Sequence, residues 1–358
     1  MNRSNAHYLS LEELPRSIFV APRDRLIQVI EKLNQNALQI AFVRAEGGQL
    51  LGTITDGDIR RAILAGKSLD TTPAREVMNA SPMRLEERTG EALALSLMRQ
   101  HHVHCIPVVR ENGEIAGAFF LDAVSPLSAA GEDAADVVLM VGGRGERLRP
   151  YTDEVPKPML PLGGKPILEH IIERFIKQGY RRFWLAVNYK ATIIEDYFGN
   201  GEKFSCDIRY LREEKPLGTA GALSLLPREE ISDQIFVMNG DLLTDVDFSA
   251  LLDFHVHSRA EATIGVTRHN VDIPFGVVQT EGIYLKSMEE KPSLSFLVNA
   301  GIYVMNKEAL SFIPPNEFFV IPALFDNLLE ADKKVSVFPL HESWADIGTV
   351  ETYERYRR

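Results

Sequence analysis

The sequence predicts an α/β protein whose larger, C-terminal part is a doubly wound, mostly parallel sheet and whose N-terminal part is a smaller α+β region. Three observations predict this. From residue 137 onward, short apolar runs alternate with segments of helical spacing, as in a parallel sheet with helices on both faces. The apolar run 137–141 leads directly into a glycine-rich loop, as at the end of a buried strand. Before residue 130, a helix–strand–strand pattern occurs twice.

The N-terminal region consists of these two similar units. The first is predicted to have a helix over 25–34 and strands over 38–43 and 50–55. The second is predicted to have a helix over 92–101 and strands over 106–109 and 115–120. Two units of similar size and order predict a pseudo-symmetric pair.

A short segment of small and acidic residues, 128–136, separates the two regions. It has no large apolar side chain and is typical of a linker. The sequence therefore predicts an N-terminal domain over 1–127, a linker over 128–136 and a C-terminal domain over 137–358.

The C-terminal region continues as alternating elements. Helices are predicted over 167–178 and 192–198, and strands over 183–187, 235–238, 262–266, 276–278, 301–305 and 335–338. In a doubly wound sheet, ligands bind at the carboxyl ends of the strands.

The composition excludes some classes of partner. The formal net charge of −11 argues against a nucleic-acid partner, which needs a basic surface. No apolar run approaches the roughly 18 residues that a membrane span requires, and residues 1–14 lack a signal-peptide core. Cys105 and Cys206 lie far apart and are expected to be reduced thiols. A cytoplasmic protein without a membrane partner is expected.

The loop after the first C-terminal strand has the composition of a polyphosphate site. Gly142, Gly143 and Gly145 let backbone N–H groups approach a ligand closely, and a row of such groups binds phosphate. Arg147 and Lys157 add positive charge. The glycines alone would fit a plain structural turn equally well, and neither the Walker A nor the GxGxxG pattern is present.

Residues 142–166, GGRGERLRPYTDEVPKPMLPLGGKP, resemble the opening motif of the sugar-1-phosphate nucleotidylyltransferases. These enzymes join a nucleoside triphosphate to a sugar 1-phosphate and release pyrophosphate, and the resemblance extends over most of 137–353. It implies a Rossmann-like nucleotidyltransferase fold, catalytic roles for Arg147 and Lys157, and nucleotide binding by the loop glycines. Glu146 departs from the threonine that many members carry and is interpreted as a subfamily mark.

Two carboxylates are candidate Mg²⁺ ligands. Asp241 follows the predicted strand 235–238, and Asp346 follows a later strand. Mg²⁺ is usually held by one or two carboxylates together with substrate phosphates. The two residues match the metal-binding aspartates that the resemblance implies. For a lone aspartate, a turn or a helix cap is the alternative.

Two further segments resemble substrate-binding motifs of the family. Gly218, Thr219, Ala220 and Gly221 resemble its base-reading segment, in a form closer to guanylyl-transferring members and to some uridylyl ones. The alternative is a helix that begins after a turn. The predicted sugar-phosphate contacts are Gly276, Glu290, Lys291 and Asn299. For Glu290 and Lys291, the alternative is an exposed ion pair of little energetic value.

The N-terminal region resembles a CBS-domain pair. Residues 52–58 of the first unit resemble the family pattern in which Thr55 and Asp58 hold a nucleotide. The second unit has Phe120 and Ala123 at the equivalent positions, so one functional site is expected at most. Capping of the following helix by Thr55 and Asp58 is the alternative.

A CBS pair fused ahead of this transferase resembles the glucosamine-1-phosphate guanylyltransferases of bacterial legionaminic acid biosynthesis. The expected reaction is transfer of GMP from GTP to glucosamine 1-phosphate with Mg²⁺. Mannose- or heptose-1-phosphate guanylyltransferase is the alternative activity. A non-catalytic nucleotide-sensing regulator or a pathway scaffold is the alternative class. A homo-oligomer with a regulatory nucleotide at the CBS pair is also expected.

Overall fold

A computed structural model describes residues 6–36, 38–101, 103–121 and 135–357. The chain divides into two compact units, Met1–Pro126 and Leu127–Arg358. Each is described by itself. The predicted linker lies largely outside the described residues.

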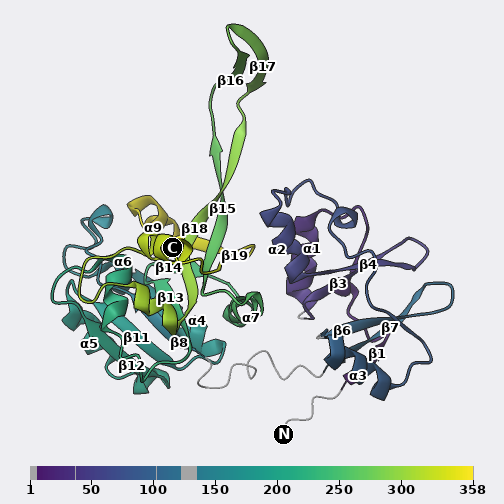
Figure 1. Cartoon of the computed structure of the whole chain (residues 1–358), viewed down its shortest axis with the longest axis horizontal. Helices are drawn as coiled ribbons and strands as arrows, with labels where there is room; N and C mark the ends of the chain where they lie inside the picture. The colour runs from purple at the N-terminus through teal and green to yellow at the C-terminus, as the bar shows by residue number, and fades with distance from the viewer. Residues whose placement is uncertain (1–5, 37, 102, 122–134, 358) are drawn as a thin grey trace. The chain divides into compact units, whose positions relative to one another are not determined.

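The N-terminal unit contains two small sheets (Figure 1). One has the strand order β2–β3–β4 and the other β1–β7–β6–β5. The strands are β1 (Ala6–Ser10), β2 (Phe19–Val20), β3 (Ile40–Arg44), β4 (Leu50–Thr55), β5 (Leu85–Glu86), β6 (Cys105–Val109) and β7 (Ile115–Leu121). The helices are α1 (Leu26–Asn36), α2 (Asp56–Leu64) and α3 (Glu91–His101).

The predicted repeat is present in this unit. The helix α1 precedes the antiparallel pair β3–β4, and α3 precedes the antiparallel pair β6–β7. Each pair is extended by a short parallel strand, β2 beside β3 and β5 beside β6. The two halves share this helix–strand–strand arrangement, and β1 adds a fourth strand to the second sheet.

The C-terminal unit is built on a seven-stranded sheet with the order β12–β11–β8–β13–β18–β15–β19. Its strands are β8 (Asp136–Met140), β11 (Arg182–Val187), β12 (Asp207–Arg212), β13 (Gln234–Asn239), β15 (Ala262–Asp272), β18 (Ser293–Asn306) and β19 (Val335–Pro339). All neighbouring pairs are parallel except those of β18, which is antiparallel to β13 and to β15. The predicted doubly wound, mostly parallel sheet is confirmed.

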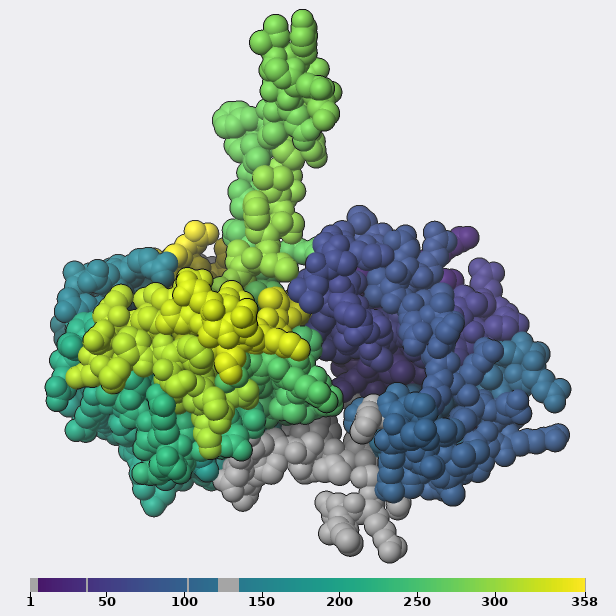
Figure 2. All heavy atoms as spheres, viewed as in Figure 1, coloured from purple at the N-terminus to yellow at the C-terminus, as the bar shows by residue number. Residues whose placement is uncertain are grey.

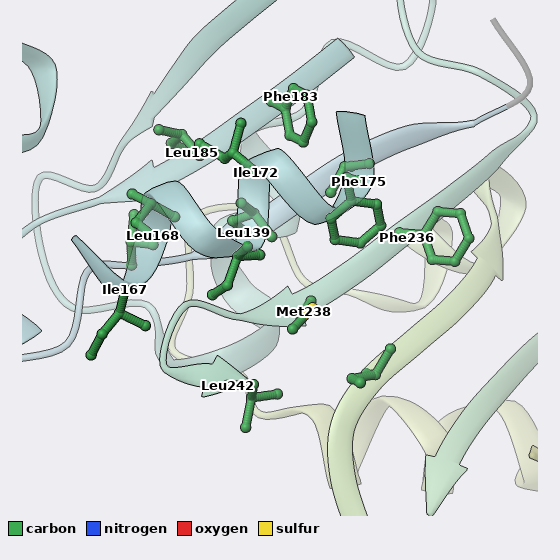
Figure 3. Close-up of a cluster of buried hydrophobic side chains, with 14 of the residues drawn as sticks. Leu139, Ile167, Leu168, Ile172, Phe175, Phe183, Leu185, Phe236, Met238 and Leu242 are labelled. Carbon is green, nitrogen blue, oxygen red and sulfur yellow. The ribbon is translucent and has the colours of Figure 1, made fainter. Parts of the chain in front are cut away.

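Helices cover both faces of this sheet. They are α4 (Ile167–Lys177), α5 (Ala191–Phe198), α6 (Gly218–Gly221), α7 (Phe248–Ser258), α8 (Ile321–Glu330) and α9 (Val350–Arg357). Consecutive side chains of β8 point to opposite faces, so Leu139 joins one core with α4 while Val138 joins the other core with α8. On the α4 side, Ile172 and Phe175 pack toward Leu139 and Phe236 (Figure 3). This two-sided burial explains the continuous apolar strand runs.

The first residue of β8 is Asp136, which the sequence places in the linker. That assignment is wrong at this residue. The Asp136 side chain is fully buried and accepts hydrogen bonds from the Arg182 guanidinium and from Ser232 N. Because a buried carboxylate needs charged and hydrogen-bonding partners, this ion pair fixes the start of β8 against β11.

A two-stranded arm extends from the sheet. The pairing of β15 with β18 continues beyond the sheet to Asp272 and Ser293, and a separate hairpin of β16 (Gly276–Glu281) and β17 (Tyr284–Glu290) follows (Figure 1). Residues 267–298 are called the arm below. The strand predicted at 276–278 exists as β16, but it belongs to the arm rather than to the main sheet.

Both cysteines are free thiols, as predicted, and burial raises their pKa. Among the helices that the structure describes, none has the length and apolar character needed to cross a bilayer.

Candidate active site

A pocket of about 420 Å³ lies at the carboxyl ends of β8 and β13. The chain order reverses here, because β11 lies on one side of β8 and β13 on the other. Such a switch point is where doubly wound sheets bind ligands. The pocket is lined by Met140, Val141, Gly143, Arg144, Gly145, Glu146, Arg147, Lys157, Pro158, Gly240, Asp241 and Gly348.

The glycine loop forms one wall of this pocket. Gly145 has φ +64°, a conformation that favours glycine, and a Cβ there would lie 3.0 Å from Cβ of Lys157 and from Cγ2 of Thr152. The Thr152 hydroxyl donates to the Gly145 carbonyl at 2.9 Å and holds the turn. Apart from its chain neighbours, no atom of the described residues lies within 4 Å of the Cβ position of Gly143, so the backbone there is open to a ligand.

Lys157 lines the pocket. It begins a short 3-10 turn after Pro156, and its side chain is buried. Its Nζ donates to the Asp241 carboxylate and lies 3.7 Å from Oδ1 of Asp346. A buried ammonium requires charged partners, and the two carboxylates supply them.

Pairing of two short strands brings the two carboxylates together. Strands β14 (Leu242–Thr244) and β20 (Trp344–Asp346) are antiparallel, with Leu242 opposite Asp346. Ile347 N also donates to the Asp241 carbonyl at 3.0 Å. These contacts join segments about a hundred residues apart in sequence. The predicted proximity of Asp241 and Asp346 is therefore present in the structure.

The electrostatics of this carboxylate pair fit a divalent cation. Burial and the Asp241 charge raise the pKa of Asp346, while Lys157 and Arg147 oppose that rise. Oδ1 of Asp241 is buried and has no hydrogen-bond partner among the described residues. An unsatisfied buried carboxylate oxygen is costly. Two carboxylates with a spare oxygen are the donors that Mg²⁺ prefers.

Arg147 lies at the exposed rim of the pocket, in the 3-10 turn that follows Gly145. Its charge opposes the rise in the pKa of Asp346 that burial and Asp241 cause. The predicted residues Gly142, Gly143, Gly145, Arg147, Lys157, Asp241 and Asp346 thus gather at one edge of the sheet.

The predicted base-reading segment has a clear packing role. A Cβ on Gly218 would lie 2.6 Å from Phe319 O, and one on Gly221 would lie 2.4 Å from Glu317 O. The Thr219 hydroxyl accepts a hydrogen bond from Ile321 N at the start of α8, and Ala220 is fully buried. The small residues are explained by close contact with residues 317–321. None of the four lines the pocket described above, so their nucleotide contacts stay a prediction.

Glu213 is a residue that the sequence analysis did not select. Its Oε2 accepts from Leu217 N at 2.8 Å, and its Oε1 lies 2.8 Å from the Cβ position of Gly142. Burial raises the pKa of Glu213. A glutamate in an exposed charge run gives no sequence signal of its own. Its position between the glycine loop and the 218–221 segment could be found only in the structure.

The predicted sugar-phosphate residues are divided between two places. Asn299 lies at the base of the arm, where it donates to Tyr303 Oη at 2.7 Å and accepts from Gly301 N at 2.8 Å. Gly276 and Glu290 face each other across β16 and β17, and Lys291 follows at φ +49°. At about 3.3 Å per residue, Ser293 lies about 20 Å beyond Asn299, and Glu290 and Lys291 lie farther out. The structure therefore does not bring Glu290 and Lys291 close to Lys157.

In the N-terminal unit, Thr55 and Asp58 form a helix cap. The Thr55 backbone N and hydroxyl both donate to Oδ2 of Asp58 at 2.8 Å, and Arg61 pairs with Oδ1 of Asp58. These contacts are those of a helix cap, the alternative to nucleotide binding that the sequence left open for Thr55 and Asp58. Both residues also line a cavity of about 430 Å³ that extends to Asn79 and His104.

The fold and the pocket define an α/β protein with a glycine-lined pocket that contains cationic side chains and lies beside paired carboxylates. Residues 136–357 match the nucleotidyl transferase family model, and residues 11–65 and 74–121 match the CBS-domain model. The first match covers more than half of the chain, so the chain belongs to the nucleotidyl transferase family.

Similar proteins include curated guanylyltransferases. The chain is 36% identical over 230 residues to the mannose-1-phosphate guanylyltransferase of Mycobacterium tuberculosis, a match that covers 62% of this chain and 63% of that protein. It is 34% identical over 225 residues to the mannose-1-phosphate guanyltransferase of Schizosaccharomyces pombe, covering 60% and 61%. The matching segment therefore spans about three-fifths of the length of these relatives.

Solved structures of the same fold include HddC from Yersinia pseudotuberculosis. It is 26% identical, has a TM-score of 0.50, and the match covers 62% of this chain and 97% of that chain. A second structure of HddC, in complex with GMP-PN, matches with 25% identity and the same TM-score and coverage.

Proposed function

We propose that the protein is a sugar-1-phosphate guanylyltransferase, which transfers GMP from GTP to a sugar 1-phosphate and releases pyrophosphate. The observation that carries the proposal is the pocket in which the glycine loop, Lys157 and the pair Asp241 and Asp346 meet. Family membership and the guanylyltransferase relatives support it.

In the proposed reaction, a phosphate oxygen of the sugar 1-phosphate attacks the α-phosphorus of GTP. The bond from that phosphorus to the bridging oxygen of the β-phosphate breaks, and pyrophosphate leaves with the electron pair. The nucleophile is already an anion, so no general base is required. Catalysis then consists of positioning and charge stabilisation. Lys157 would bridge the reacting phosphates, and Arg147, at the pocket rim, would stabilise the leaving group.

Asp241 and Asp346 would hold Mg²⁺, and the ion would neutralise phosphate charge when bound. The buried Oδ1 of Asp241 and the raised pKa of Asp346 support this assignment, since a cation compensates both. Lys157 partly neutralises the same carboxylates and so keeps them in place without the ion.

Glu213 supports a guanine base. Guanine presents two adjacent donors, N1–H and the N2 amino group, whereas adenine has an acceptor at N1. A carboxylate between the phosphate loop and the 218–221 segment would accept both donors. Glu213→Gln would then raise the KM for GTP by at least about tenfold, the value of one charged hydrogen bond.

For the sugar, glucosamine 1-phosphate is the first candidate, because of the fusion of a CBS pair to the transferase. Mannose 1-phosphate is the second, because curated relatives are mannose-1-phosphate guanylyltransferases.

The test is pyrophosphate release from the full-length protein with Mg²⁺, each common nucleoside triphosphate and a panel of sugar 1-phosphates. Release with GTP and glucosamine 1-phosphate alone supports the proposal in full. Release with GTP and mannose 1-phosphate retains the reaction and changes the sugar. An absence of release with every pair, with and without added adenine or guanine nucleotides, would favour a nucleotide-sensing protein.

We also propose that the cavity beside Thr55 and Asp58 binds a nucleotide that adjusts the transferase. Its volume of about 430 Å³ and the Arg61 guanidinium at its wall suit a phosphate-bearing ligand.

A further inference from the structure

The arm is the least buried part of the C-terminal unit. Beyond Val266, β15 pairs only with β18, and β16 and β17 pair only with each other. Nearly every residue of the arm is exposed, and it projects well beyond the sheet that carries it (Figure 2). A two-stranded ribbon with both edges unpaired is marginally stable alone, and free edges promote association with another chain.

The arm also carries most of the exposed apolar surface. Of the seventeen large apolar side chains exposed among the described residues, ten lie on the arm. They are Val271, Phe275, Val278, Ile283, Tyr284, Leu285, Met288, Leu294, Phe296 and Leu297. Ile283 at the tip is 90% exposed. A concentration of apolar side chains of this kind marks a protein interface.

The charge and size of the arm fit a second copy of the same chain. The arm has three Lys or Arg and four Asp or Glu residues, a net charge of about −1, in a chain with a formal net charge of −11. Its near-neutral surface is therefore not repelled by an identical acidic molecule. Its 32 residues slightly exceed the roughly 20–30 residues that each partner contributes to a standard interface, so the arm is large enough to form one.

The arm leaves the sheet at the edge that carries the active site. Strand β15 is parallel to β19, and β18 is antiparallel to both β13 and β15, so β15 runs in the direction of β13. Its carboxyl end therefore lies at the same edge as Gly240 and Asp241. Two copies whose active-site edges face each other would each present an arm to the other's pocket.

We propose that two copies of this chain exchange arms, so that Glu290 and Lys291 of one copy complete the active site of the other. This inference rests on the proposed function, which needs a cation for the sugar phosphate. Lys291 is exposed on the arm, outside the pocket of its own chain. The exchange is reciprocal and closed, as in a twofold dimer.

The regularity of the ladder favours exchange over folding back onto the same chain. Six consecutive pairs, from Thr267 with Val298 to Asp272 with Ser293, continue the pairing inside the sheet. The irregularity in this ladder lies between Ile264 and Val266, within the sheet. These pairs hold the ribbon in its extended form, and exchange between two copies keeps that form.

Complementation between two inactive variants tests the exchange. Full-length Lys157→Ala and Lys291→Ala chains are co-expressed with different tags and purified through both. Alone, the Lys157→Ala chain is expected to lose at least about a hundredfold in kcat. Alone, the Lys291→Ala chain is expected to lose about tenfold in kcat/KM. With exchange, one site of the mixed dimer has both lysines, so about half of the wild-type turnover returns. Activity no higher than the mean of the two variants, or failure of the chains to co-purify, overturns the proposal.

A matched pair of surface variants tests the role of the apolar tip. Adding Ile283→Asp to the Lys157→Ala chain is expected to lower the recovered turnover at least about tenfold, since it places a charge in the buried interface. Leu329→Asp, at a side chain 58% exposed on α8, is expected to leave the recovery unchanged. Equal recovery with both substitutions would overturn the proposal.

A measurement without turnover separates this inference from the proposed function. A benzophenone amino acid at position 275, where Phe275 is 73% exposed, is activated by light in the full-length protein. A covalent product of two chains, cross-linked to residues of the glycine loop, is expected even if no pyrophosphate release is found. A cross-link to the loop of the same chain, or none, contradicts arm exchange. Full turnover of Lys291→Ala removes its role in the site and leaves the guanylyltransferase activity standing.

Discussion

At the residue scale, Lys157 contacts both halves of the candidate site. Its ammonium is buried between Asp241 and Asp346, and its Cβ packs against the loop at Gly145. One side chain thus links the glycine loop to the carboxylate pair. This geometry suits the proposed role of Lys157, in which its ammonium stabilises negative charge on the reacting phosphates.

Lys157→Met should therefore lower kcat at least about hundredfold, as removal of one charge-stabilising donor does in other enzymes. Pyrophosphate release under saturating substrates measures it. Lys177→Met, at an exposed position on α4, is the matched control and should keep wild-type turnover. A Lys157→Met variant with near-normal kcat would rule out this catalytic role.

The second residue-scale prediction concerns Asp346. The raised pKa of its carboxyl means that the folded state disfavours the ionised form at neutral pH. Asp346→Asn removes this penalty, so its melting temperature in EDTA should equal or exceed that of the wild type. The rise in melting temperature that Mg²⁺ gives the wild type should be lost. Thermal melts with EDTA and with millimolar Mg²⁺ measure both effects, and an undiminished Mg²⁺ response would remove Asp346 from the metal site.

At the element scale, His255 holds α7 to the sheet. Its Nδ1 lies 2.8 Å from Thr263 Oγ1 on β15, and its Nε2 lies 3.1 Å from Asn306 Oδ1 on β18. Burial lowers the pKa of His255, so the folded state holds this imidazole neutral. The neutral ring satisfies both contacts as one donor and one acceptor.

The free energy of unfolding of the C-terminal unit should consequently decrease as the pH is lowered below about 6.5, which is the pKa of an unfolded histidine. There the unfolded chain binds a proton that the folded chain does not. One such group changes the free energy of unfolding by at most about 1.4 kcal/mol per pH unit. Urea unfolding between pH 7.5 and 5.5 should show a weaker pH dependence for His255→Gln than for wild type. His257→Gln, on the exposed side of the same helix, should behave as wild type.

The small residues of the short helix α6 are required by packing alone. Gly218 and Gly221 lie so close to the backbone of residues 317–319 that a Cβ cannot fit. These glycines join α6 to the start of α8. A motif that resembles a base-reading segment thus has a structural requirement of its own.

At the scale of the whole molecule, a CBS pair is joined to a transferase unit in one chain. Each unit has its own buried core, because the core clusters lie within one unit or the other. A ligand of the N-terminal unit can influence turnover only if the two units are coupled. The proposed regulatory nucleotide is therefore tested on the full chain.

Isothermal titration of the full chain with adenine and guanine nucleotides should detect binding that Asp58→Ala weakens at least about tenfold. The substitution removes the carboxylate that the Thr55 hydroxyl and Arg61 contact, and it costs the α2 cap about 1 kcal/mol. Glu13→Ala, which removes a comparable cap-like contact with Ser10 away from the cavity, controls for this loss. Equal affinity in all three proteins would reject the site.

Much of the C-terminal fold could be predicted because its signals are local. Apolar runs such as 137–141 and the helical spacing of 167–178 mark buried elements, and they appear as β8 and α4. The glycine loop, Lys157, Asp241 and Asp346 carry recognisable spacing, and they meet at one sheet edge.

The amino-acid sequence by itself determined the alternation of elements, the repeat in the N-terminal unit and the glycine loop that follows β8. These depend on short-range periodicity and on glycine conformation. Only the tertiary structure decided that Asp136 is a buried partner of Arg182, that Glu213 lies beside Gly142, and that Glu290 and Lys291 stand on an arm. The physical reason is that each depends on which distant segments pair, and local sequence pattern does not encode those long-range contacts.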